Sequence, residues 1–247
     1  VDYVLDESQT KELSYTVEYY KDGILADTEV ERAVVQVLQP DTMTVNKDAI
    51  NLVDKYFGYK LAEGVVVPDT VNSGDVIRID YITDDGNTKV LSYTVEYYKD
   101  GVKQENDTQT KTQTVQVLEA DTLTVDKAAI NVTDKYEGYY FDSTEPENIP
   151  DVINSGEVIK VNYVIRKDLS YTVEYYFNNV IDDTLTEVIN NQTFNSVVEN
   201  YTDKVKVGYK LDKVETLPMT IGVNENIVRV YYVTDEAQTK ELSYTVE

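Results

Sequence analysis

The sequence contains no cysteine, no histidine and no tryptophan, and only two methionines, four phenylalanines and five prolines. Without cysteine and histidine, the chain can form no disulfide bridge and offers no thiol nucleophile, no imidazole acid–base group and none of the usual zinc-binding sets. No apolar run approaches the roughly 20 residues that a membrane-spanning helix needs, and no secretory signal peptide is present. We therefore expect no cofactor and no insertion of this chain into a membrane.

Positive charge is also scarce, because 22 Lys and Arg side chains stand against 46 Asp and Glu side chains, for a net charge of −24. A chain this acidic is repelled by nucleic-acid phosphates and anionic lipid headgroups, so neither is an expected partner. The acidity is typical of solubility and self-repulsion along an extended molecule. A pair of carboxylates could in principle hydrolyse a glycoside, but no pair stands out from this background, and we expect no enzymatic activity.

What the sequence does have is internal repetition and 22 tyrosines. The octapeptide Leu-Ser-Tyr-Thr-Val-Glu-Tyr-Tyr begins at Leu13, Leu91 and Leu169, and a shortened copy begins at Leu242. Recurrence of this kind indicates tandem domains, and on this basis we expect further copies on both sides of the chain. The predicted boundaries are 1–12 for the tail of a preceding repeat plus linker, 13–82 for repeat 1, 91–165 for repeat 2, 169–234 for repeat 3, and 235–247 for a linker and the start of a following repeat.

The opening segment of each repeat alternates between apolar and polar side chains. In repeat 1 the apolar positions are Leu13, Tyr15, Val17 and Tyr19, and the polar positions are Ser14, Thr16, Glu18 and Tyr20. A period of two with one apolar face predicts a half-buried strand. The Asp22-Gly23 pair that follows predicts a tight turn into a second strand. A closing strand is predicted where Ile77, Ile79 and Tyr81 alternate with polar residues.

The segment 46–56 has a different period. Spacings of three and four residues separate its apolar side chains, which are Val45, Ala49, Val53 and Tyr56. This spacing favours a short amphipathic helix, with Asn46 as its N-cap and Gly58 as its stop. Each repeat is therefore predicted to contain a hairpin, a short helix, one or two short strands and a final strand, which is an α+β fold rich in strands.

These features resemble the MucBP and internalin B-repeat group, which are repeats of Gram-positive surface adhesins. The resemblance rests on the Tyr-Thr-Val-Glu-Tyr-Tyr strand followed by Asp-Gly, on the closing Val-x-Val-x-Tyr-Val strand and on tandem copies of this length, and it is strongest at 201–212. It implies three tandem ubiquitin-like β-grasp domains in an elongated rod. It also implies display on the cell surface or cell wall and, for some members, binding to mucin or other host glycans.

Three tyrosines at the same place in each repeat are candidate ligand-binding residues: Tyr20, Tyr98 and Tyr176. They fall on the outward face of the first strand, where a ring could stack on a sugar. A site repeated along an array would also gain avidity. The alternative is that these rings cover the far face of the sheet or shield a contact between domains.

The linker between the first two repeats holds a weak candidate for calcium ligation, Asp84, Asp85 and Asn87. The segment lacks the twelve-residue loop pattern of a calcium site, and the second linker has no counterpart to it. A flexible turn is the favoured interpretation, so we expect no metal site. The sequence also identifies no triad for an intramolecular isopeptide bond.

Taken together, these features lead us to expect a monomeric, extracellular repeat region of a bacterial cell-surface adhesin. It would act as an extended stalk and bind mucin or other host glycans or glycoproteins weakly along its length. Two alternatives stay open. The repeats could be a dedicated multivalent glycan-binding module that uses the exposed tyrosines, or they could be accessory repeats of a larger surface enzyme.

Overall fold

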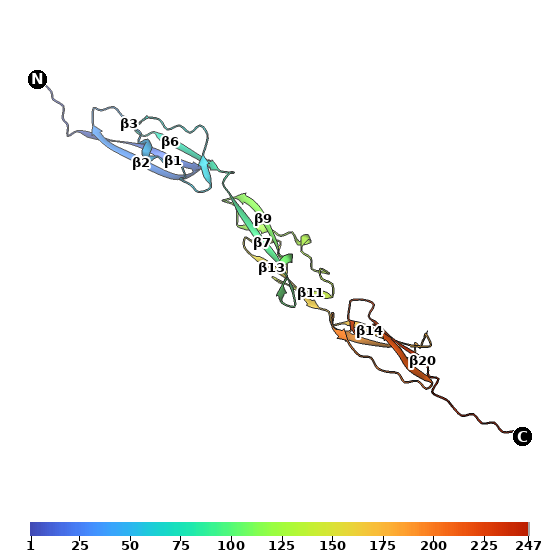
Figure 1. Cartoon of the computed structure of the whole chain (residues 1–247). Coiled ribbons are helices and arrows are strands. Elements are labelled where there is room, and N and C mark those ends of the chain that lie inside the picture. The colour runs from blue at the N-terminus through green and yellow to red at the C-terminus, as the bar shows by residue number, and fades with distance from the viewer. Residues whose placement is uncertain (247) are drawn as a thin grey trace. The chain divides into compact units, whose positions relative to one another are not determined.

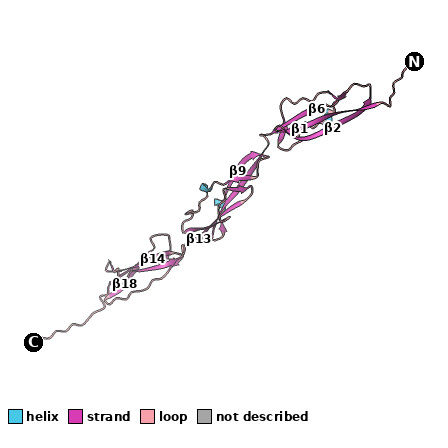
Figure 2. Cartoon of the chain, turned by 180° about the vertical axis from the view of Figure 1, so that it is seen from behind, coloured by secondary structure: helices cyan, strands magenta, loops and turns pink. Residues whose placement is uncertain are grey.

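Strands account for 49% of the chain and helix for only 4% in the computed structural model, which describes residues 1–246. Figure 2 shows the strands in magenta and the few helical pieces as small cyan turns. Within the described residues no helix reaches seven residues, and none is long and apolar enough to cross a membrane. The helical pieces are three-residue 3-10 turns: η1 (Lys47–Ala49), η2 (Glu105–Asp107) and η3 (Lys127–Ala129).

The prediction of an α+β, ubiquitin-like β-grasp fold is therefore wrong. A β-grasp needs a helix packed across its sheet, whereas here irregular chain and a second, two-stranded sheet provide the cover. In repeat 1 the partly buried side chains that pack against the core from those irregular segments include Leu52, Val65 and Val67. The chain forms a set of small all-β sheets.

The chain separates into two compact units, Val1–Leu91 with Thr112–Asp121, and Ser92–Lys111 with Thr122–Glu247. Repeat 1 lies in the first unit and repeat 3 in the second, while the predicted repeat 2 is divided between them. The predicted repeat boundaries stay predictions.

The strands fall into one main sheet and one two-stranded sheet for each repeat (Figure 1). The strands of repeat 1 are β1 (Thr10–Lys21), β2 (Ile24–Gln36), β3 (Thr42–Thr44), β4 (Tyr59–Leu61), β5 (Thr70–Asn72) and β6 (Val76–Thr83). They form a main sheet in the order β2-β1-β6-β4 and the pair β3-β5.

The strands of repeat 2 are β7 (Thr88–Lys99), β8 (Val102–Lys103), β9 (Gln109–Gln116), β10 (Thr122–Thr124), β11 (Tyr139–Glu145), β12 (Val152–Asn154) and β13 (Val158–Ile165). They form a main sheet in the order β11-β13-β7-β8, in which β9 also pairs with β7, and the pair β10-β12. Repeat 3 has the order β15-β14-β20-β18, with β16 also on β14, and the pair β17-β19; its strands are β14 (Leu169–Phe177), β15 (Val180–Ile181), β16 (Glu187–Gln192), β17 (Val197–Val198), β18 (Tyr209–Glu215), β19 (Met219–Thr220) and β20 (Ile227–Thr234).

The first and last long strands of each repeat lie side by side and parallel, as β1 with β6, β7 with β13 and β14 with β20. The predicted alternation of the opening strand is confirmed, since Leu13, Tyr15, Val17 and Tyr19 are all buried. The predicted closing strand is confirmed in the same way by the burial of its inward-facing residues. Parallel pairing thus sets two half-buried strands against each other at the centre of each sheet.

The predicted Asp-Gly turn is also confirmed. Asp22 and Gly23 both have positive φ, 46° and 80°, and join β1 to β2. Two successive left-handed residues match the right-handed twist of a hairpin, and Asp-Gly adopts them at low cost. In repeat 3 the same turn is made by Asn178 and Asn179, with φ of 48° and 66°. The sequence at this turn therefore determines the hairpin directly.

The predicted helix over 46–56 does not form beyond η1, and Asn46 makes no side-chain cap. Its backbone groups bond elsewhere: the Asn51 carbonyl accepts from the Tyr81 hydroxyl at 2.6 Å, and the Asn46 amide donates to the Tyr15 hydroxyl at 3.2 Å. Val53, placed on the apolar face of the predicted helix, is 71% exposed. An isolated helix of this length is marginal, so hydrogen bonds from the buried tyrosines outweigh the helical ladder.

The same tyrosine anchoring recurs in the other repeats. In repeat 2 the peptide groups of Asn131 are held on both sides, because its amide donates to Tyr97 at 3.1 Å and its carbonyl accepts from Tyr163 at 2.9 Å. In repeat 3 the Tyr175 hydroxyl donates to the Thr202 carbonyl at 2.6 Å. A tyrosine supplies both a large apolar ring and a hydroxyl that satisfies irregular backbone. This double use explains why tyrosine outnumbers phenylalanine in these thin cores.

A lysine fastens the irregular segment of repeat 1 to the second strand. Lys55 Nζ lies 3.2 Å from Asp27, 2.8 Å from Glu29 and 3.8 Å from the centre of the Tyr19 ring. Burial lowers the pKa of Lys55, but its hydrogen bonds to Glu29 and Asp27 outweigh this and raise the pKa overall. The Lys55 side chain therefore stays an ammonium ion, and its ion pairs hold the irregular segment against β2.

Candidate ligand-binding face

The three candidate tyrosines lie on the open face of the main sheets, the side that the core does not occupy. Tyr20, Tyr98 and Tyr176 are each half-buried and follow a fully buried tyrosine on the same strand. Because neighbouring residues of a strand point to opposite faces, the core tyrosine fixes the outward direction of the next one. The structure thus places these residues as the alternation predicts, and their role as ligand-binding residues stays a prediction.

Each of these tyrosines is joined to a glutamate two residues earlier on the same face. The Tyr20 hydroxyl donates to Glu18 at 2.7 Å, the Tyr98 hydroxyl to Glu96 at 2.7 Å and the Tyr176 hydroxyl to Glu174 at 2.8 Å. The hydrogen bond to the carboxylate raises the pKa of each tyrosine hydroxyl above its ordinary value. The rings are thereby held along the strand with neutral hydroxyls.

The parallel register brings a basic residue opposite each glutamate: Arg78 opposite Glu18, Lys160 opposite Glu96 and Arg229 opposite Glu174. In repeat 1 the Arg78 guanidinium lies 3.8 Å from the centre of the Tyr20 ring and pairs with Asp80 at 2.8 Å. The hydrogen bond from Arg78 holds the pKa of Asp80 below its ordinary value.

These tyrosine, glutamate and basic residues define what we call the open-face triad of each repeat. Sequence reasoning found only the tyrosine. The signal for the other two is present, since every closing tyrosine of the last strand is preceded by a basic residue three positions earlier. Only the parallel pairing of the first and last strands shows that this residue lies opposite the glutamate. It covers the tyrosine ring in repeat 1, whereas in repeat 2 Lys160 pairs with Glu145.

Repeat 3 extends its triad into a larger aromatic surface. Tyr231 stacks on Tyr176 with ring centres 4.9 Å apart and an interplanar angle of 21°. Lys213 lies 4.7 Å above the Tyr231 ring, and the Tyr231 hydroxyl donates to Glu215 at 3.1 Å. Flat rings bordered by carboxylates and amines combine stacking with hydrogen bonds to hydroxyl groups.

The acidic linker forms a turn. The Asp84 carboxylate accepts from the Gly86 amide at 3.2 Å and pairs with Lys60 at 3.3 Å. The Asn87 amide donates to the Asp84 carbonyl at 3.0 Å. Among residues 1–246, no group of three or more acidic side chains could hold a metal ion.

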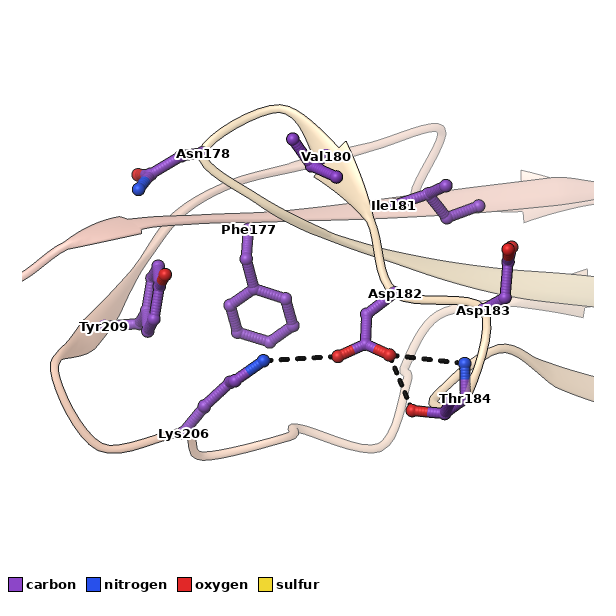
Figure 3. A pocket seen from close by; sticks show the side chains of 9 residues that line it. All are labelled: Phe177, Asn178, Val180, Ile181, Asp182, Asp183, Thr184, Lys206 and Tyr209. Atoms are coloured by element: carbon purple, nitrogen blue, oxygen red, sulfur yellow. Dashed lines mark hydrogen bonds and ion pairs between the residues drawn. The ribbon is translucent and has the colours of Figure 1, made fainter.

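An open pocket lies at the end of β14 in repeat 3 (Figure 3) and was not predicted from the sequence. Phe177 and Tyr209 form its aromatic wall, and Lys206 lies across it, 4.4 Å from the centre of the Phe177 ring and 3.2 Å from Asp182. The Lys206 ammonium group and the Asp182 carboxylate form an ion pair with each other. The pocket is therefore explained by a cation–aromatic contact within the repeat.

That contact appears in reverse in the other repeats. In repeat 1 the strand-end residue is Lys21, whose ammonium lies 5.1 Å from the centre of the Tyr56 ring. In repeat 3 the strand-end residue is the aromatic Phe177, and the loop supplies the cation, Lys206. Cation and ring have exchanged places while the contact has been kept, which indicates that the pairing itself stabilises this end of the repeat.

We expect Phe177→Lys and Lys206→Tyr each to destabilise repeat 3, and the double variant, which restores the arrangement of repeat 1, to recover about 0.5–2 kcal/mol. Chemical denaturation of the wild type, both single variants and the double variant measures this coupling. If the losses in the free energy of unfolding of the two single variants simply add in the double variant, the cation and the ring are not energetically coupled.

The comparisons with known proteins give little beyond this geometry. No family model matches the chain, and no curated protein matches it. A solved structure described as "Streptococcal High Identity Repeats in Tandem (SHIRT) domains 3-4 from cell surface protein" is similar to the chain at 9% identity and a TM-score of 0.27, covering 59% of this chain and 98% of that one. The resemblance to the MucBP and internalin group stays a prediction.

Proposed function

We propose that this chain is a repeat region of a bacterial cell-surface adhesin, in which a small β domain is multiplied to form a stalk that also contacts host glycans. The observation that carries the proposal is the open-face triad, which recurs in the same strand register in all three repeats. The core requires only the inward side of these strands. The other side of the strands carries a half-exposed tyrosine, a glutamate and a basic residue. These are therefore the side chains that a ligand can contact.

Binding at one triad is weak in this proposal, because the face is open and much of a ligand would stay in water. Repetition compensates for this weakness, since linked sites raise the effective concentration of the second binding event. The net charge of −24 keeps the chains apart and directs the interaction toward neutral or basic partners. Neutral mucin-type glycans and glycoproteins are the proposed ligands, and the protein acts as a monomer outside the cell.

The combined variant Tyr20→Ala, Tyr98→Ala, Tyr176→Ala should lose most of its retention on immobilised mucin, by at least about tenfold, because three stacking surfaces are removed at once. Retention is measured by affinity chromatography or surface plasmon resonance, with circular dichroism to show that the variant is folded.

The matched control replaces tyrosines outside the open faces, Tyr3→Ala and Tyr244→Ala, which are 93% and 89% exposed. It should bind as the wild type does. Equal retention by both variants would contradict the assignment of the open face.

Small-angle scattering tests the stalk separately. An elongated monomer is expected, and a compact particle would contradict this role. If the wild type binds no mucin or purified glycan but is elongated, the function is that of a spacer alone. Binding that strengthens with the number of repeats favours a dedicated multivalent module.

A further inference from the structure

A glycine turn near the closing strand of repeat 1 receives a loop that follows the second strand of repeat 2. The loop residues are Gln116, Val117 and Leu118. Leu118 covers Gly58 so closely that a Cβ there would lie 2.7 Å from Leu118 Cδ2. The Gln116 Nε2 group donates to the Gly58 carbonyl at 3.1 Å and to the Asp84 carbonyl at 3.2 Å. We call the glycine turn the socket and the loop the plug.

The same arrangement joins repeats 2 and 3. Here the socket is Gly138 and the plug is Phe194, and a Cβ on Gly138 would lie 2.2 Å from Phe194 Cδ1. The Phe194 amide donates to the Arg166 carbonyl at 2.9 Å, as the Val117 amide donates to the Asn87 carbonyl at 3.0 Å. The side chain of the plug differs between the two junctions, but the left-handed glycine of the socket and the backbone bond are retained.

A third plug is present in repeat 1, and no socket lies against it in the part of the chain that the structure describes. Val37 and Leu38 occupy the positions of Val117 and Leu118, and Leu38 is 77% exposed whereas Leu118 is 44% exposed. The backbone of this free plug is already set: the Val37 amide donates to the Gln9 carbonyl at 2.8 Å. Gln36 donates to the Asp6 carbonyl at 3.3 Å, as Gln116 does to Asp84.

A third socket is present in repeat 3, and within residues 1–246 no apolar plug covers it; the Gly208 amide donates to Gln238 Oε1 at 2.9 Å. Gly208 has a φ of 84°, close to the 81° of Gly58 and the 76° of Gly138, yet a Cβ on Gly208 would meet nothing within 4 Å. Its carbonyl accepts from the Asp235 amide at 2.8 Å, as the Gly58 carbonyl accepts from Asp84 at 2.9 Å. The free socket therefore has the backbone of the two occupied ones.

We propose that the Val37–Leu38 plug and the Gly208 socket are the two halves of one docking surface, and that the partner each half fits is a further repeat of the same kind, linked in head-to-tail order as repeats 1 to 3 are. The occupied junctions show what each half contacts. To fit the plug, the partner must have a glycine in the left-handed conformation. To fit the socket, it must have a loop with an apolar side chain that follows a glutamine, or a similar loop. This inference is independent of glycan binding.

A joined protein tests the proposal without a foreign linker. Gln238 to Tyr244 repeats the sequence of Gln9 to Tyr15, so residues 1–237 of one copy can be followed directly by residues 9–247 of a second. In this protein the free socket of the first copy meets the free plug of the second. Hydrogen exchange at the Leu38 amide of the second copy should slow by about tenfold relative to the single chain, because the Leu38 side chain becomes partly covered, as Leu118 is at the occupied junction.

The decisive variant is Gly208→Ala. In the single chain it carries only the cost of a left-handed alanine, whereas in the joined protein it should also cancel the slower exchange at Leu38. Gly138→Ala is the reference for an occupied socket. Leu38→Ser in the second copy of the joined protein should loosen the Gly208 turn of the first copy, whereas Leu38→Ser in the single chain should leave the Gly208 turn unchanged. Unchanged exchange at Leu38 on joining, or equal effects of Gly208→Ala in both proteins, would overturn the proposal.

Discussion

Tyr136→Phe is expected to lower the free energy of unfolding of repeat 2 by about 1–3 kcal/mol, because the change removes a hydrogen bond to a charged partner. The Tyr136 hydroxyl donates to the Asp107 carboxylate at 2.5 Å. Burial, and then this hydrogen bond, raise the pKa of Tyr136 far above its ordinary value. The same contact is the largest cause of the lowered pKa of Asp107. Chemical denaturation followed by circular dichroism measures the loss.

Repeat 1 offers a matched control at the same position. The Tyr56 hydroxyl is buried and has no hydrogen-bond partner within the described residues, although its ring packs edge-on against Tyr81 as Tyr136 packs against Tyr163. Tyr56→Phe removes an unsatisfied polar group and should leave repeat 1 unchanged or slightly more stable. Equal losses in the two variants would show that ring packing, and not the Asp107 contact, accounts for the effect.

Alkaline pH should unfold the protein cooperatively. Burial is the main cause that raises the pKa of Tyr19, Tyr163 and Tyr232 to about 12, from an ordinary value of 10.0, and there is one such tyrosine in each repeat. Since the folded state holds these protons more tightly than the unfolded state, their contribution to stability is complete below pH 10. It is lost as the pH rises from about 10 to about 12.

The measurement follows tyrosinate absorbance and circular dichroism in one titration. The part of the tyrosinate signal that comes from the buried tyrosines should appear together with the loss of the strand signal over this interval, because the buried hydroxyls ionise only as the sheets open. Tyr163→Phe should make the pH dependence of unfolding less steep, since one linked proton is removed. Complete tyrosine ionisation near pH 10 with the strand signal intact would contradict the argument.

The alternation of side chains was enough to predict the central strands, because a period of two leaves only one way to bury the apolar face. Leu13 to Tyr19 and Ile77 to Tyr81 lie as this pattern requires. The Asp22-Gly23 turn was equally predictable, since these two residues adopt positive φ at low cost, although the Asp22 carboxylate also accepts from Thr83 of the closing strand. The identity of the recurring segments also follows from the sequence without any structure.

The predicted helix over 46–56 does not form beyond η1, although the apolar spacing that predicts it is present in the sequence. The Tyr81 hydroxyl, distant in the chain, donates to the Asn51 carbonyl that a helix would have used, and the Tyr15 hydroxyl holds the Asn46 amide at the start of the segment. No local pattern shows that competition. The same limit applied to the candidate site, where sequence reasoning found Tyr20 but not Arg78, which only strand pairing places over its ring.

The sequence by itself therefore determined the elements whose hydrogen bonds and burial are local or periodic: the opening and closing strands, the left-handed turns and the repetition. Only the tertiary structure decided what covers the sheet, which residues share its open face, and that a glycine of one repeat receives the loop of the next. These depend on long-range contacts, in which a side chain from one segment satisfies the backbone of another. Such contacts leave no period in the sequence.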